Sequence, residues 1–395
     1  MSTNAVKIEE LISRGVERVY PNEDFLRKRL TSGERLKIYF GIDPTGPTLH
    51  LGHAVPLRKL KQFQELGHEV VLLIGDFTAR IGDPDKKEVR KQLSHKEVLT
   101  NARLYKEQAA TFLSFSGKNP ATLAFNNKWL GALKFADVLE LASKVTVQQM
   151  LERDMFKKRI VEEKPIYVHE FMYPLMQGYD SVAMDVDGEV GGNDQTFNML
   201  TGRTLLKEMK EKEKFVLPMK LLVDPSGEKM GKTTGNMLSF LDSPEDKFGK
   251  VMSWTDEMIY SGFELCTNHD LSVVQQRLGS GENKRDIKMD LAYEVVATYH
   301  GEDVAQKAKQ GFENTFQKNS VPESVEAIVV ENGKALSELL VENGIVESKT
   351  DFKRLVAAGA IVNKTTDTKV TDSNGVAEEG TYKIGKHRFI RIEII

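Results

Sequence analysis

The sequence has almost no cysteine. Cys266 is the single cysteine among 395 residues. One thiol excludes an internal disulfide and excludes a zinc site built from several cysteines. A chain without disulfides suits a reducing compartment, so we expect a cytoplasmic protein.

Long hydrophobic runs and a strong charge of one sign are also missing. No segment approaches the roughly 18 apolar residues of a membrane-spanning helix, and the first residues, MSTNAVKIEELISRG, resemble neither a signal nor a transit peptide. Lys and Arg total 55 against 58 Asp and Glu, a net charge of −3. We therefore expect no membrane contact, and any nucleic acid must be bound by a local basic patch.

The first part of the chain predicts a parallel sheet. Residues 37–42 (KIYFGI) and 70–76 (VVLLIGD) are apolar runs typical of buried strands. Between them, roughly from Leu49 to Leu66, apolar residues recur at helical spacing, with Thr48 as the expected N-cap. Strand, helix and strand form a βαβ unit. Ligands of such sheets bind beyond the carboxyl ends of the strands, which makes the loop after residue 42 the first candidate site.

Changes in pattern along the rest of the chain predict the domain borders. Helical patterns cover 128–160 and 170–184, residues 215–223 suggest another buried strand, and the segment from Ser243 to about Gln317 is helical throughout. We expect four parts: a first domain at 1–225 with a helical insertion at about 130–165, a lysine-rich loop and helical domain at 226–320, a linker at 321–334, and a small α+β domain at 335–395.

The segment GIDPTGPTLHLGH, residues 41–53, places His50 and His53 around Gly52 at a predicted helix start. A catalytic zinc would need further protein ligands, and the HExxH pattern is absent. Helix capping or solvent exposure of the histidines is the simplest alternative. The free N–H groups of a helix start attract phosphate, and a glycine lets a flat base approach the backbone. The pattern therefore favours a nucleotide site.

A second glycine-rich segment, GEKMGKT at 227–233, fails the P-loop pattern because Ser226 stands where glycine is required. A solvated surface loop is the alternative. Lys229 and Lys232 nevertheless offer two cations beside glycines, which suits a triphosphate whose charge must be neutralised as pyrophosphate leaves.

Together, HLGH (50–53) and KMGKT (229–233) resemble the signature pair of class I aminoacyl-tRNA synthetases. YFGIDPTGPTLHLGH, IGDP (81–84), MQGYDS (176–181) and GGNDQ (191–195) look like bacterial tyrosyl-tRNA synthetases. The end of the chain is similar to an S4 RNA-binding domain. The resemblance covers nearly the whole chain, but Gly231 and Thr233 replace the two serines of the KMSKS form that is common in the family.

This resemblance implies an α/β fold: a Rossmann-like parallel-sheet catalytic domain, an α-helical anticodon-recognition domain and a small α+β S4-like domain. It implies a tyrosine–tRNA ligase that forms tyrosyl-adenylate from L-tyrosine and ATP and then charges tRNA(Tyr). ATP is a co-substrate, Mg²⁺ accompanies its phosphates, and no structural metal is expected. The implied assembly is a homodimer that uses the helical insertion.

Family roles carried onto matching positions give a tyrosine site. Tyr39 and Asp180 would hold the phenol, and buried groups that depend on that hydroxyl would reject phenylalanine. The remaining residues implied for tyrosine bind the ammonium (Asp83, Tyr173, Gln177), line the pocket (Thr78, Asn126) or approach the reacting carboxylate (Gln195).

The implied ATP site surrounds the two signature motifs. Residues near the nucleotide would be Gly41, Asp43, Gly52, Gly192 and Asp194. Residues acting on the departing phosphates would be Thr45, His50, His53, Lys87, Lys229, Lys232 and Thr233. Because the attacking carboxylate is already ionised, positioning and charge stabilisation suffice for the first step.

Two basic clusters are candidates for RNA contact. The first, on a helix, holds Lys284, Arg285 and Lys288, and the second, in the S4-like segment, holds Ser348, Lys349, Lys353 and Arg354. Most such clusters are simply solvated faces. If phosphate contacts dominate, RNA binding will weaken with salt.

Two other functions stay open at this point. A related enzyme could activate tryptophan, although the presence of both Tyr39 and Asp180 argues against it. A non-catalytic RNA-binding relative would be favoured by loss of HLGH or of the loop lysines, and neither is lost.

Overall fold

The computed structural model describes residues 3–83, 93–227, 237–317, 327–330, 333–385 and 388–394. The chain divides into two compact units, each built from two stretches of sequence. The first unit holds Met1–Asp242 and Trp254–Leu291, and the second holds Ser243–Ser253 and Ala292–Ile395. The predicted helical domain at 226–320 is therefore shared between two units rather than forming one of its own.

The first unit is built on a five-stranded sheet with the order β3-β2-β1-β4-β5, and all its pairings are parallel. Its strands are β1 (Lys37–Ile42), β2 (Glu69–Ile74), β3 (Thr122–Phe125), β4 (Gly188–Gly192) and β5 (Phe215–Met219). This confirms the predicted parallel sheet. The strand order reverses between β1 and β4, and ligands of open parallel sheets bind at such a reversal.

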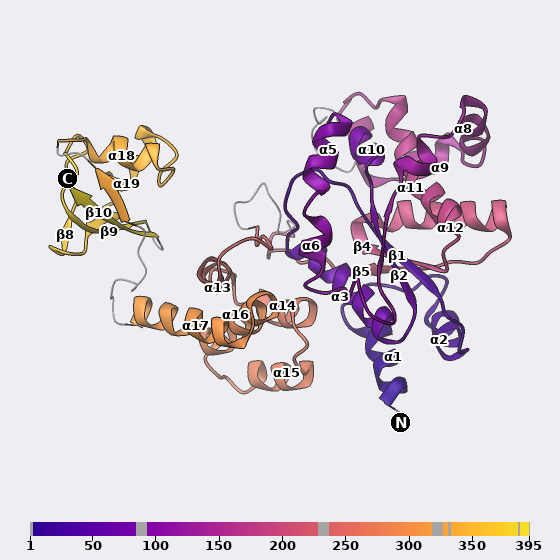
Figure 1. Cartoon of the computed structure of the whole chain (residues 1–395), viewed down its shortest axis with the longest axis horizontal. Helices are drawn as coiled ribbons and strands as arrows, with labels where there is room; N and C mark the ends of the chain where they lie inside the picture. The colour runs from indigo at the N-terminus through magenta and orange to yellow at the C-terminus, as the bar shows by residue number, and fades with distance from the viewer. Residues whose placement is uncertain are drawn as a thin grey trace. The chain divides into compact units, whose positions relative to one another are not determined.

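Helices cover both faces of this sheet. Phe215 stacks on Phe63 of α3 (Leu51–Glu65), with ring centroids 5.8 Å apart. Lys214, the residue before it, contacts Ser181 of α11 (Val168–Met184). Because successive residues of an extended chain point to opposite faces, α3 and α11 lie on opposite sides of the sheet (Figure 1). Helix α12 (Thr196–Lys210) packs on α11 and on β4 and β5.

The remaining elements of the first unit are short. The helical pattern predicted at 128–160 is broken into four helices. The other elements are α1 (Thr3–Ser13), α2 (Glu23–Thr31), α4 (Thr78–Ile81), α5 (His95–Ala102), α6 (Tyr105–Ala109), α7 (Asn127–Leu130), α8 (Phe135–Ala142), α9 (Val147–Leu151), α10 (Asp154–Val161), η1 (Asn193–Gln195), α14 (Met258–Cys266) and α15 (Leu271–Gly279). Among the described residues, no helix has both the length and the apolarity to cross a membrane.

The second unit contains helices and a separate sheet with the order β6-β10-β9-β7-β8. Its elements are α13 (Pro244–Met252), α17 (Glu302–Gln317), β6 (Ala327–Val330), α18 (Leu336–Glu342), α19 (Lys349–Ala357), β7 (Ile361–Asn363), β8 (Thr368–Lys369), β9 (Gly380–Ile384) and β10 (Arg388–Ile394), together with the later half of α16 (Lys284–His300). The predicted linker at 321–334 is partly wrong, because β6 pairs in parallel with β10. Ile328 and Val330 lie in the buried core of this sheet.

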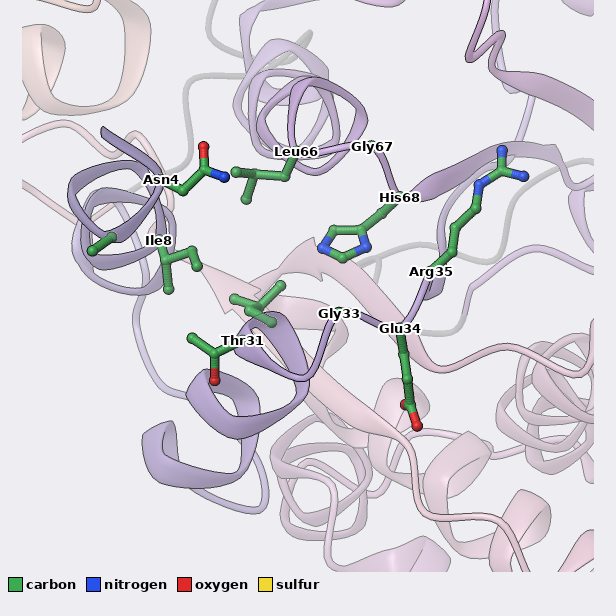
Figure 2. A pocket seen from close by; sticks show the side chains of 11 residues that line it. Asn4, Ile8, Thr31, Gly33, Glu34, Arg35, Leu66, Gly67 and His68 are labelled. Atoms are coloured by element: carbon green, nitrogen blue, oxygen red, sulfur yellow. The ribbon is translucent and has the colours of Figure 1, made fainter. Parts of the chain in front are cut away.

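A groove of about 430 Å³ lies where the first strands begin (Figure 2). It is lined by α1, by the end of α2 and by the turns that lead into β1 and β2, including Ile8, Arg35, Leu66 and His68. His68 is held by the Leu36 amide, which donates to its Nδ1 at 3.3 Å, and burial lowers the pKa of the ring. The groove is at the amino ends of the strands, away from the end where parallel sheets bind ligands.

Candidate active site

The histidine motif forms the start of α3. His50 is the N-cap, so the expected cap at Thr48 is wrong. The Gly52 amide donates to His50 Nδ1 at 3.2 Å, the His50 amide donates to His53 Nδ1 at 3.1 Å, and the two rings lie 3.9 Å apart. The histidines therefore act partly as capping residues, which satisfies two of the amides at the helix start.

The chain that follows the lysine-rich segment is paired with this motif. The Leu51 amide donates to the Leu238 carbonyl at 2.9 Å, and the Phe240 amide donates to the Leu49 carbonyl at 3.0 Å. Ser239 and His50 pair through their backbones as an isolated antiparallel β-bridge. Residues 237–240 are thereby fixed beside the start of α3. Lys87, Lys229, Lys232 and Thr233 lie outside the described residues.

Asp180, expected at the phenol, is buried near the carboxyl ends of the strands. Its side chain accepts from Trp129 Nε1 at 2.7 Å and from Asn126 Nδ2 at 3.2 Å. Burial raises the pKa of Asp180 well above its usual range, while the two hydrogen bonds act in the opposite direction. Trp129 comes from the short helix α7 and was not expected from the sequence.

Asp43 connects residues that were expected to bind different substrates. Its carboxylate accepts from Thr78 Oγ1 at 2.6 Å and from the Tyr173 hydroxyl at 2.9 Å. Asn126 also donates to Thr78, at 3.0 Å. A continuous hydrogen-bonded series thus runs from Asp180 to Asp43. Thr78 and Tyr173, expected to bind tyrosine, are thus hydrogen-bonded to Asp43, which was expected near the nucleotide.

A second carboxylate, Asp83, is hydrogen-bonded to residues from two other segments of the chain. Gln195 Nε2 donates to it at 2.8 Å and Arg153 Nη2 donates at 3.3 Å. Arg153 comes from the helical insertion, is 6% exposed and lies over the Phe156 and Phe197 rings. The insertion therefore contributes to the site itself. No sequence pattern indicated this role, because Arg153 is one of several charged residues in a helical segment.

Tyr39 and Gln177 meet at a buried ion pair that sequence reasoning missed. Lys214 Nζ lies 2.5 Å from Glu189 Oε2 and 2.8 Å from Ser181 Oγ. The Tyr39 hydroxyl lies 3.1 Å from the same Ser181 oxygen, and Gln177 Nε2 donates to Glu189 Oε1 at 3.1 Å. A carboxylate inside a central strand was the available signal, because buried acids need a partner.

The residues expected around the nucleotide also lie at this edge of the sheet. Gly41 and Gly192 are at the ends of β1 and β4, and Gly52 is exposed in the first turn of α3. A Cβ on Gly192 would fall 2.4 Å from Asp194 Oδ1, so this carboxylate lies against bare backbone. Thr45 is half-buried, and its amide donates to the Asp43 carbonyl at 2.7 Å.

The candidate RNA residues have different environments. Lys284 and Arg285 are exposed on α16, and Lys349, Lys353 and Arg354 are exposed on α19. Ser348 is the N-cap of α19. The prediction for Lys288 is corrected, because this residue is only 8% exposed. Its ammonium donates to the Trp254 carbonyl at 2.6 Å and to Asp256 at 2.8 Å. We therefore remove Lys288 from the RNA-binding set.

The variant Lys288→Ala is expected to lower the free energy of unfolding by about 1–3 kcal/mol, because it leaves the buried Trp254 carbonyl without its donor. Chemical denaturation of the purified protein measures this. Lys284→Ala, which removes an exposed lysine four residues earlier on the same helix, is the control and should change stability little. Equal stability of the two variants would restore Lys288 as an RNA candidate.

Comparison with known proteins agrees with this geometry. The family model described as tRNA synthetases class I (W and Y) matches residues 31–317. The tyrosine–tRNA ligase of Colwellia psychrerythraea is 45% identical, with 97% of each chain covered, and that of Moorella thermoacetica is 43% identical, covering 97% of this chain and 94% of the relative. The relative from Mannheimia succiniciproducens is 42% identical over the whole of both chains.

Solved structures show the same fold. A truncated mitochondrial tyrosyl-tRNA synthetase from Aspergillus nidulans has a TM-score of 0.64 at 25% identity, covering 78% of this chain and 94% of that one. A tyrosyl-tRNA synthetase from Archaeoglobus fulgidus, solved with L-tyrosine, has a TM-score of 0.61 at 22% identity, covering 77% and 99%. The chain belongs to the class I tRNA synthetases, within the tyrosine–tRNA ligases.

Proposed function

We propose that the cluster at the carboxyl ends of β1, β2 and β4 activates L-tyrosine with ATP and then charges tRNA(Tyr). The observation that carries this is the hydrogen-bonded series from Asp180 through Asn126 and Thr78 to Asp43 and Tyr173. This series supports the proposal because it joins the buried Asp180, the proposed acceptor for the phenol, to Asp43, the acidic group proposed beside the nucleotide. A carboxylate that attacks the α-phosphorus needs such positioning and needs no protein nucleophile.

Tyrosine would bind with its phenol between Tyr39 and Asp180. Its ammonium would meet the Asp83 carboxylate, the Tyr173 hydroxyl and the amide oxygen of Gln177, whose amide nitrogen is already used by Glu189. The substrate ammonium would share Asp83 with Arg153, 3.3 Å away. Gln195, bonded to the other oxygen of Asp83, would lie next to the reacting carboxylate.

ATP would lie against the start of α3 and the end of β4. The helix start and the imidazoles of His50 and His53 would face the phosphates, with Thr45. Asp194 would accept from the ribose, and Gly41, Gly52 and Gly192 would leave space for the nucleotide. Lys87, Lys229, Lys232 and Thr233 complete the proposed phosphate set. The pairing of residues 238–240 with 49–51 supports the assignment of Lys229, Lys232 and Thr233, which precede residue 238 in the chain, to the same site.

Mg²⁺ belongs to the proposal as part of the ATP substrate. Within the described ranges, no group of three or more His, Cys, Asp or Glu side chains could hold a metal ion. No step of the proposal uses a protein-bound metal centre.

A homodimer is proposed through the helical insertion. Large apolar side chains are exposed in the insertion, at Phe135 (77%), Leu139 (56%), Val147 (61%) and Val161 (84%), and just after it at Val168 (79%). Phe135 and Leu139 are four apart on α8 and share one face. Apolar side chains left in water at this density are typical of a protein interface.

Glutamates at both Phe135 and Leu139 are expected to raise the dimer dissociation constant by at least about a hundredfold, since interface hot spots contribute 2 kcal/mol or more each. Sedimentation velocity over a range of protein concentrations measures this. Val6→Glu alters an apolar residue of α1 that is 55% exposed and is the control. Unchanged association of the double variant would remove α8 from the proposed interface.

RNA contact is proposed for the exposed residues of two helices. Lys284 and Arg285 on α16 would meet the anticodon arm, and Ser348, Lys349, Lys353 and Arg354 on α19 would meet RNA in the S4-like part. Lys349 and Arg354 are paired with Glu338 and Asp351. The side chains of Lys349 and Arg354 are exposed and those of Glu338 and Asp351 partly exposed, and surface pairs of this kind are weak enough for phosphate to displace the carboxylates. We place this activity in the cytoplasm.

Aminoacylation of tRNA tests the whole proposal. The protein should attach tyrosine to tRNA(Tyr) in the presence of ATP and Mg²⁺, and chelation of Mg²⁺ should stop the reaction. Tryptophan charged onto tRNA(Trp) would overturn the substrate assignment. No charging by folded protein would favour the RNA-binding relative.

A further inference from the structure

Resting on the proposed tyrosine site, we propose that Lys214 and Ser181 are positioning residues that fix the Tyr39 hydroxyl as the hydrogen-bond donor to the substrate phenol. They would thereby help the enzyme reject phenylalanine. Neither residue needs to contact tyrosine. Their effect passes through Tyr39, the residue expected at the phenol.

The network is fully enclosed. Tyr39, Ser181 and Lys214 are 0% exposed and Glu189 is 2% exposed. Tyr39 lies on β1, Ser181 on α11 and Glu189 on β4, and Lys214 immediately precedes β5. A buried ion pair contributes little to stability on average, because desolvation opposes the attraction between the charges. Stability alone therefore gives a weak reason for a lysine here.

The packing leaves a defined space for the ammonium. A Cβ on Gly202 of α12 would lie 2.8 Å from Lys214 Nζ and 2.8 Å from Ser181 Oγ. A Cβ on Gly178 of α11 would lie 3.3 Å from the Gly202 Cα. The close approach of the two helices at these glycines makes room for Lys214 beside Ser181.

The chemistry of the groups sets the direction of each hydrogen bond. An ammonium only donates, so Ser181 Oγ accepts from Lys214 at 2.8 Å. In the proposed arrangement the serine proton points to the Tyr39 oxygen, 3.1 Å away. The Glu189 carboxylate accepts from Lys214 and Gln177. Burial, together with the charge of Glu189 and a hydrogen bond to it, raises the pKa of Tyr39. Tyr39 therefore keeps its own proton, which it can turn from Glu189 to a phenol oxygen.

Asp180 completes the arrangement on the other side. It precedes Ser181 on α11, and its carboxylate can only accept when ionised. A phenol between the two would accept from Tyr39 and donate to Asp180. Phenylalanine offers neither, and both buried groups would lose a partner.

The test is the ratio of kcat/KM for tyrosine to that for phenylalanine in ATP–pyrophosphate exchange. Ser181→Ala should lower this ratio about tenfold, the value of one neutral hydrogen bond, and leave the KM for ATP unchanged. Ser181→Thr keeps a hydroxyl and should restore the ratio. Thr201→Val is the control, since it removes a buried hydroxyl that donates to the Phe197 carbonyl of its own helix.

A second variant guards against misfolding of the first. Lys214→Met combined with Glu189→Gln removes both charges together and should lower the ratio similarly. If wild type exchanges with tyrosine but both variants keep its ratio, the positioning role is wrong and the network is only structural. If wild type does not exchange with tyrosine, the proposed function itself fails.

Discussion

The substitution Gly75→Ala is expected to lower kcat/KM for tyrosine activation at least about a hundredfold. Gly75 follows β2, and a Cβ there would lie 1.9 Å from Asp43 Oδ1 and 2.4 Å from Thr78 Oγ1. Both side chains would have to move, and their hydrogen bond joins the proposed tyrosine and ATP parts of the site. A displacement of about 1 Å in a positioned site can cost two orders of magnitude in rate.

The measurement is pyrophosphate exchange with tyrosine and ATP varied in turn. Because Asp43 is shared, kcat/KM should fall for both substrates. Gly249→Ala is the matched control: this glycine lies within α13, and a Cβ there meets nothing within 4 Å. The melting temperatures of both variants should be recorded. A folded Gly75→Ala protein with normal exchange would show that Asp43 and Thr78 are not part of the active site.

Methionine at position 59 is expected to remove a large part of the pH dependence of stability. Lys59 of α3 is 3% exposed, and its ammonium donates to the Leu11 carbonyl of α1 at 2.7 Å. Burial lowers the pKa of Lys59 to about 7. Between pH 7 and pH 10 the unfolded chain keeps a proton on this lysine that the folded chain releases.

The contribution of Lys59 to the free energy of unfolding must therefore rise with pH across this window. It is lowest below pH 7. At 1.36 kcal/mol per pKa unit, Lys59 contributes a difference of about 3.5 kcal/mol between pH 7 and pH 10. In Lys59→Met this contribution should be missing, so the free energy of unfolding should rise less between pH 7 and pH 10 than it does in wild type.

Denaturant unfolding at several pH values measures the effect. Lys61→Met, on the same helix with its side chain 44% exposed, should leave the pH profile unchanged. Parallel profiles for wild type and Lys59→Met would mean that Lys59 keeps its proton in the folded protein.

Local patterns predicted the central elements of the fold well. Residues 37–42 were expected to form a strand and do so as β1, because an apolar run before a proline- and glycine-rich loop allows few other structures. The βαβ unit then determined the sheet type and the edge at which the site lies. Resemblance to the family supplied the individual site residues, and the structure brings many of them into one hydrogen-bonded cluster.

What the sequence could not show depends on contacts between distant segments. Lys214 and Ser181 are 33 residues apart, and no spacing rule indicates that they touch. Lys288 belonged to an apparently basic patch, but helical position alone did not reveal that its ammonium is buried against Trp254. Residues 327–330 seemed irregular because an edge strand of four residues is defined by its partner, β10.

Amino-acid-dependent ATP–pyrophosphate exchange without tRNA is the decisive test of tyrosine activation by this protein. Tyrosine, phenylalanine and tryptophan should be compared with the same enzyme preparation. We expect rapid exchange with tyrosine and little with the other two, because only the tyrosine phenol offers a hydrogen-bond partner to both Tyr39 and Asp180. Equal exchange with phenylalanine, or exchange with tryptophan in place of tyrosine, would contradict it.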